Sequence, residues 1–122
     1  MTENPNKYNL EERTAKFGEN IIKLCQKFYK NSISEPLIIQ LIRSSTSVGA
    51  NYCEADDAES GQDFKHKIGI CKKEARESKH FLRMLAIAVP EHVEEIRNLW
   101  QEAKELNLIL NAIYKKVNSK LN

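Results

Sequence analysis

The strongest constraint on the fold is a run of apolar residues near the end of the sequence, with spacings that alternate between three and four. The run consists of Ile96, Leu99, Ala103, Leu106, Leu110, Ile113 and Val117. This spacing places the side chains on one face of an α-helix, as in the packing seam of a helical bundle. Trp100 and Tyr114 flank one edge of the seam and Ile109 the other, so the stripe is wider than a two-stranded coiled coil requires. The pattern predicts a long helix at about residues 91–118, whose width suits a bundle core and would equally suit an additional subunit contact.

Three earlier segments also have helical periodicity, at about residues 10–30, 35–57 and 61–88. No segment has the period-two alternation of a β-strand. The connections between the segments are short, which favours antiparallel neighbours. A chain of 122 residues suffices for one domain with a modest core, but not for two. The sequence therefore predicts an all-α, antiparallel up-down four-helix bundle that forms a single domain over residues 1–122.

Capping residues mark the beginnings of these segments. Asn9 precedes the first helix, with Glu12 in the capping-box position. Ser34 is the expected cap of the second helix, because proline is tolerated in the first turn of a helix and Pro36 follows. Ser60 is the expected cap of the third helix. Pro90 fits the first turn of the fourth.

Composition excludes several classes of protein. No apolar run approaches the length that spans a membrane, and the first residues lack the apolar core of a signal peptide. Three cysteines, Cys25, Cys53 and Cys71, lie inside helical patterns without a CxxC pair. Such cysteines are expected to be reduced and buried, which indicates a cytoplasmic protein.

Positive charge is concentrated in the third segment. Residues 62–85 carry seven basic and three acidic side chains, a net charge of +4, whereas the whole chain carries +2. Most of these cations fall on one narrow face of the helix. The residues of this cationic row, our candidates for nucleic-acid binding, are Lys65, Lys72, Lys73, Arg76, Lys79 and Arg83. Such a row suits a phosphate backbone, but a solvated helix face or a site for an acidic protein surface would have the same pattern. No aromatic residue interrupts the row within this helix, so base stacking is not expected.

A second polar pattern indicates a structural network. One strip of the second helix carries amides, hydroxyls, one arginine and one glutamate, in place of the lysines and glutamates of a solvated face. Glu74 lies on the apolar side of the third helix and needs a partner there. Folding the two helices back on each other places Arg43 near Glu74, with Glu77 one turn further along. We therefore expect an ion pair from Arg43 to Glu74 or Glu77, unless Arg43 extends to solvent. The full expected network is Arg43, Ser47, Asn51, Glu54, Glu74 and Glu77.

Catalytic and metal sites are not expected. The E-x-x-H spacing of di-iron bundles occurs at Glu77–His80, and a related spacing occurs at Asp63–His66. Both lie on one helix, about 21 Å apart at 1.5 Å per residue, so they cannot share a metal within one subunit. The serines at positions 44, 45 and 47 have no nearby histidine to activate them, and no glycine-rich phosphate loop is present. We expect a protein that is not an enzyme and has no cofactor.

The sequence resembles a known family in two separate motifs. QLIRSSTSV at residues 40–48, followed by Asn51 and Glu54, is similar to a motif of the four-helix bundle proteins encoded in bacterial 23S rRNA intervening sequences. KEARES at residues 73–78, followed by Phe81 and Leu82, is similar to a second motif of that family. The resemblance covers about residues 10–118. Ala55 replaces the glycine that is usual in the family.

The resemblance implies an assembly and a class of partner. The family is similar to a retroelement accessory protein that forms a pentamer and binds a reverse transcriptase and nucleic acid. A homo-oligomer, a pentamer by this resemblance, is therefore expected, with RNA or DNA as the partner. The alternative is a scaffold that holds a protein partner without nucleic acid, using exposed apolar surface such as Leu108. Binding that falls steeply with salt would favour the first hypothesis.

Overall fold

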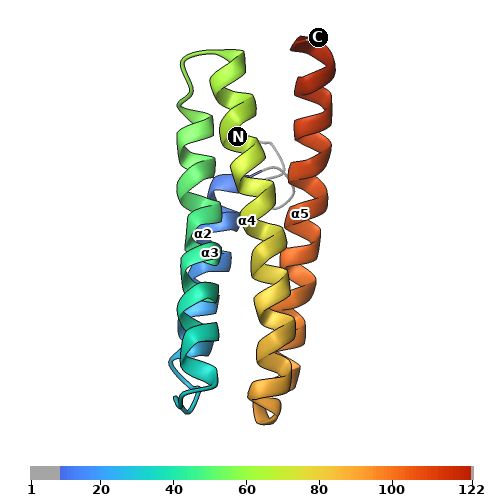
Figure 1. The fold of residues 1–122 in the computed structure, drawn as a ribbon. Coiled ribbons are helices and arrows are strands. Elements are labelled where there is room, and N and C mark those ends of the chain that lie inside the picture. Colours follow the sequence, from blue (N-terminus) through green and yellow to red (C-terminus); the bar gives the residue numbers. More distant parts are fainter. Residues whose placement is uncertain (1–8, 122) are drawn as a thin grey trace.

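Four long helices run alternately up and down in the computed structural model, which describes residues 9–121 (Figure 1). They are α2 (Leu10–Cys25), α3 (Ser34–Asp56), α4 (Gly61–Ala88) and α5 (Val93–Leu121), with a short 3₁₀ turn at Pro90–His92. No strand occurs within residues 9–121. The predicted all-α, antiparallel up-down four-helix bundle is confirmed. The domain expected over residues 1–122 includes residues 1–8 and 122, which lie outside the described part.

Two of the predicted caps are confirmed by hydrogen bonds from a backbone amide to the capping side chain. The Asn9 side chain accepts a hydrogen bond from the Glu12 amide at 3.1 Å. Ser60 accepts one from the Asp63 amide at 3.0 Å. Each bond satisfies one of the amides that a helix N-terminus leaves without a partner.

The turn between α2 and α3 differs from the prediction. The first helix ends at Cys25 and not near residue 30, because the amides of Lys27 and Phe28 bond to carbonyls three residues back, which tightens the chain into a turn. Ser34 is already helical and is not the cap. The Asn31 side chain instead accepts from the amides of Ile33 and Ser34, both at 2.8 Å.

The connection between α4 and α5 also differs in detail. Pro90 begins a 3₁₀ turn, and the regular helix begins only at Val93. The Val89 amide donates to the Leu85 carbonyl and closes α4. The fourth helix therefore begins two residues later than the predicted position 91.

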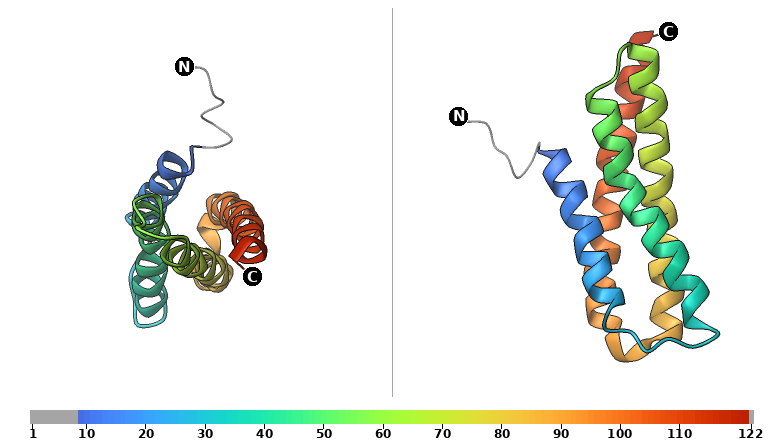
Figure 2. Two further views of the ribbon diagram at one scale, coloured as in Figure 1. Left: turned by 90° about the horizontal axis from the view of Figure 1, so that it is seen from above. Right: turned by 90° about the vertical axis from the view of Figure 1, so that its left-hand side faces the viewer.

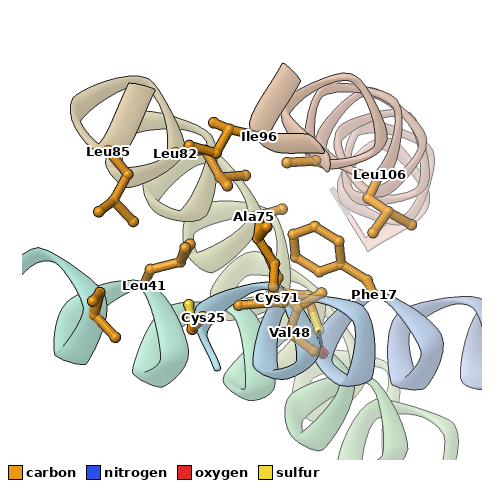
Figure 3. Close-up of a cluster of buried hydrophobic side chains, with 14 of the residues drawn as sticks. Phe17, Cys25, Leu41, Val48, Cys71, Ala75, Leu82, Leu85, Ile96 and Leu106 are labelled. Carbon is orange, nitrogen blue, oxygen red and sulfur yellow. Dashed lines mark hydrogen bonds between the residues drawn. The ribbon is translucent and has the colours of Figure 1, made fainter. Parts of the chain in front are cut away.

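The core follows the predicted apolar faces. Phe17 of α2 lies among small residues of the neighbouring helices, such as Cys71 and Ala75, which are fully buried (Figure 3). Ala103 on α5 is buried as well. The small side chains leave room for the aromatic ring at the centre of the bundle. A close-packed interior of this kind is sensitive to the loss of a large side chain.

The four helices have unequal lengths. The shortest, α2, packs mainly against α3 and touches α5 less, while α4 packs extensively against both α3 and α5. In the side view on the right of Figure 2, α3, α4 and α5 extend beyond the start of α2. The long α4–α5 pair therefore forms one side of the bundle, and this side carries the candidate site.

The cysteines only partly match the expectation. Cys25 and Cys71 are buried, and burial raises the pKa of Cys25 to about 11 and that of Cys71 to about 12. Cys53 is exposed, which contradicts the expectation that all three are buried. It lines a shallow hollow between α2 and α3. No helix of the described chain is long and apolar enough to cross a membrane.

Candidate nucleic-acid interface

The cationic row lies along the outer side of α4, beside α5. Lys73, Arg76 and Arg83 are exposed, whereas Lys65, Lys72 and Lys79 are half-buried. None of the six makes an ion pair with a carboxylate of residues 9–121. The structure therefore brings the predicted cations together on one side of the bundle and leaves their charges uncompensated by these residues.

Two aromatic side chains from α5 lie beneath the half-buried lysines. The Nζ atoms of Lys65 and Lys72 lie 5.8 and 4.8 Å from the centre of the Tyr114 ring. Lys79 Nζ lies 5.5 Å from the Trp100 ring. These distances are within the range of cation–π attraction. The cationic row is thus an edge built by two helices, with lysines from α4 and rings from α5.

The two helices meet in a regular register along this edge. Lys65, Lys72 and Lys79 repeat at heptad spacing on α4, and positions 100, 107 and 114 repeat at heptad spacing on α5. Between the two aromatic contacts, the Asn107 amide nitrogen donates to the Lys72 carbonyl at 2.7 Å. Three lysines therefore face a tryptophan, an asparagine and a tyrosine, at intervals of about 10 Å.

Gly69 permits the close approach of Tyr114 to α4. A Cβ atom at position 69 would lie 3.2 Å from Cε1 of Tyr114, which is closer than ordinary van der Waals contact. In the sequence, Gly69 leaves a gap in the cationic row. In the structure, the aromatic ring fills this gap.

Two shallow hollows open on the edge, one beside each aromatic residue. The first has a volume of about 370 Å³ and is lined by Tyr114 with Lys65, Lys72, Lys73 and other residues of α4. The second, of about 500 Å³, lies beside Trp100 and is lined mainly by apolar side chains, with Arg83 from α4 and Arg97 from α5. Both hollows combine an aromatic ring with cations.

The expectation that no aromatic residue interrupts the row is therefore wrong for the folded protein. It considered α4 alone, whereas the rings come from α5. Trp100 and Tyr114 were visible in the sequence only as residues at the edge of the apolar seam. The signal that could have found them is the shared heptad spacing of 65, 72 and 79 with 100, 107 and 114. An antiparallel pairing aligns these two sets.

The predicted ion pair between α3 and α4 is confirmed. Arg43 Nη2 lies 2.7 Å from a carboxylate oxygen of Glu77, and Nη1 lies 3.4 Å from Glu74. Burial, together with the neighbouring Glu77, raises the pKa of Glu74, and Arg43 opposes this rise. Arg43 thus holds two carboxylates that would otherwise repel each other.

The rest of the predicted polar network is divided into separate contacts. Asn51 donates to the Ser47 carbonyl and to its hydroxyl, at 3.0 and 2.9 Å, and no hydrogen bond within residues 9–121 joins either residue to Arg43. Glu54 instead pairs with Lys67 at 2.6 Å. The reason is that each charged member on α3 is held by a partner on α4, Arg43 by Glu74 and Glu77 and Glu54 by Lys67.

Replacing Arg43 by methionine should lower the free energy of unfolding by roughly 1 kcal/mol at neutral pH, a small effect because the arginine side chain is about half exposed. Without Arg43, the pKa of Glu74 should rise further. A raised pKa means that the folded state holds this proton more tightly, so the contribution of Glu74 to stability is present at low pH and is lost as the pH rises through its folded pKa. The difference between variant and wild type should therefore shrink as the pH falls toward 4.5, the ordinary value for this carboxyl. Urea unfolding of both proteins at neutral pH and at pH 4.5 measures this difference. An equal loss of stability at both pH values would contradict the ion pair between Arg43 and Glu74.

The histidine motifs do not form a joint site. Glu77 of the first E-x-x-H spacing is engaged by Arg43, and His80 packs edge-on against Phe81. Within residues 9–121, no group of three or more potential ligands is placed to hold a metal ion.

The comparisons with known proteins agree with the fold. A family model described as 23S rRNA-intervening sequence protein matches residues 6–112. A solved structure from Bacteroides thetaiotaomicron VPI-5482, a protein with unknown function from the S23 ribosomal protein family, is similar with a TM-score of 0.74 and 30% sequence identity, over 86% of this chain and 97% of that chain. No relative of curated function matches. The chain therefore belongs to the 23S rRNA-intervening sequence protein family.

Proposed function

We propose that this protein is a cytoplasmic, non-enzymatic nucleic-acid-binding protein that contacts RNA or DNA through the α4–α5 edge. The observation that carries the proposal is the concentration of six cations along this one edge, without carboxylate partners in the part of the chain that the structure describes. Arg13, Lys27, Arg43 and Lys67 each have a carboxylate within ion-pairing distance. The six cations of the row have none among residues 9–121, so they are available to phosphates.

A homo-oligomer would strengthen such binding. One copy of residues 62–85 carries a charge of only +4, and a few phosphate contacts give weak affinity. Several copies on one strand would act together, because each further contact becomes intramolecular. The family resemblance suggests five copies.

The test is filter binding of RNA at two salt concentrations, with a Lys72→Glu, Arg76→Glu double variant. The wild type should bind with an affinity that falls steeply with salt, because binding releases counterions. The double variant should bind at least about tenfold more weakly at low salt and depend less on salt. A Lys23→Glu, Lys30→Glu variant is the matched control, since it makes the same charge change on exposed residues away from the row.

Two outcomes would count against the proposal. One is the absence of RNA binding by the wild type. The other is an equal loss of binding in both double variants, which would indicate an effect of net charge alone.

A protein scaffold is the second candidate, and one observation favours it. Leu108 is 58% exposed on α5, away from the core seam. Apolar surface of this kind can hold a protein partner. Association that persists at high salt and is lost in Leu108→Gln would support the scaffold function.

A further inference from the structure

We infer that the hollow beside Trp100 receives an unpaired base, so that the nucleic acid bound by this protein is single-stranded. This inference rests on the proposed function and adds the class of nucleic acid to it. It starts from the hollow itself, which neither the charge pattern nor the family match assigns to any ligand.

The hollow has the construction of a site for a flat, partly apolar group. Its volume is about 500 Å³, within the range of roughly 300–1,000 Å³ that is typical of ligand sites. Its aliphatic lining comes from Leu82 and Ile96, which are buried, and from Ala86, which is half-buried. Trp100 supplies an aromatic ring beside these aliphatic side chains. Together they form a surface on which a nucleobase can stack.

The charges around the hollow match a nucleotide. Arg83 and Arg97 line it from opposite helices, and both are exposed. Lys79 and Lys104 lie over the Trp100 ring, at 5.5 and 5.7 Å from its centre. No carboxylate is among the lining residues. A phosphate next to the stacked base would therefore meet up to four cations.

Only an unpaired base can use this arrangement. In a duplex, each base is covered above and below by its neighbours, whereas a single strand exposes base faces to aromatic side chains. In the free protein, the ammonium groups of Lys79 and Lys104 lie over the Trp100 ring. When a strand binds, its phosphates attract these lysines and the base takes their place, since base–aromatic stacking is stronger than an exposed cation–π contact.

The Tyr114 hollow repeats the same combination further along the edge. Its ring is covered by Lys65 and Lys72, and it lies about 21 Å from Trp100 along α5. A single strand that follows the cationic row would pass both rings. Two such hollows along one edge favour the binding of an extended single strand over the binding of one small molecule.

The experiment uses the fluorescence of Trp100, the single tryptophan of the chain. The full-length protein is titrated with an unstructured RNA of about 20 nucleotides, which exceeds the roughly 4–16 nucleotides of known single-strand sites. The same RNA annealed to its complement is the duplex probe. The single strand should quench the Trp100 emission and bind on the order of tenfold more tightly than the duplex.

Variants separate stacking from charge. Trp100→Leu keeps an apolar side chain but removes the ring, and should weaken single-strand binding by about tenfold with the same salt dependence, because no cation is lost. Trp100→Phe keeps a ring and should restore most of the affinity. Tyr29→Leu is the matched control, since it removes a 75% exposed aromatic residue that lines neither hollow. Circular dichroism of each variant confirms that the helices are retained.

The outcomes distinguish this inference from the proposed function. If the wild type binds neither probe, the proposed function itself fails. If it binds both equally, or if Trp100→Leu binds the single strand as well as the wild type, the protein binds nucleic acid by charge alone and the inference is overturned.

Discussion

Replacing Phe17 by alanine should lower the free energy of unfolding by about 3–5 kcal/mol, the range for removal of a buried aromatic ring. The side chain is 1% exposed and lies in the core near the small buried residues Cys71 and Ala75 (Figure 3). Small residues cannot close the cavity that the ring would leave. Because a domain of this size has a total stability of about 5–15 kcal/mol, the variant should be close to unfolded at moderate urea concentrations.

Urea unfolding followed by circular dichroism measures this loss. Ile22→Ala on the same helix is the control, because Ile22 is 39% exposed and its removal should cost less than about 1 kcal/mol. If Phe17→Ala were no more destabilising than the control, α2 would not be docked as described.

Replacing Arg13 by methionine should lower the free energy of unfolding by about 2 kcal/mol. Arg13 forms two parallel bonds to the Glu102 carboxylate, at 2.8 and 2.9 Å, and a third to Glu105 at 2.9 Å. These bonds join α2 to α5, which otherwise touch little. The guanidinium is 23% exposed and Glu102 is 28% exposed. The expected loss therefore falls between the small value of a surface ion pair and the large value of a buried one.

Methionine keeps the apolar stem of Arg13 and removes only its fork of donors. Lys16→Met is the matched control, since its contact with Glu19 is 3.9 Å long and about 60% exposed and should change stability by less than about 0.5 kcal/mol. A double-mutant cycle with Glu102→Gln isolates the pair. A coupling energy near zero would contradict the role of Arg13 as a link between the two helices.

The fold could be predicted from the sequence because its signals are local and repeated. The heptad seam from Ile96 to Val117 and the caps at Asn9 and Ser60 each depend on residues within a few positions of one another. Errors arose where a turn is fixed by contacts beyond this range. The return of Phe28 to the core is an example. The bonds of Asn31 to the amides of Ile33 and Ser34 are local, and there the prediction of Ser34 as the cap was wrong.

The candidate site was predicted only in part. The cations of α4 share one helical face, so a wheel drawn from the sequence finds them. The Arg43–Glu74 contact could also be predicted from the sequence, because a short turn fixes the register of α3 against α4. The aromatic rings were not found, since they belong to another helix and face the row only through the α4–α5 register.

By itself, the sequence determined that four amphipathic helices form, where most of them begin and end, and which faces turn inward, because helical periodicity and capping act over a few residues. The tertiary structure alone decided which side chains of different helices meet. It placed Trp100 and Tyr114 beneath the lysines, split the polar strip of α3 into separate pairs, and left the cationic row without carboxylate partners among residues 9–121. The physical reason is that contacts between helices depend on register and rotation, and these are set by the packing of the whole core.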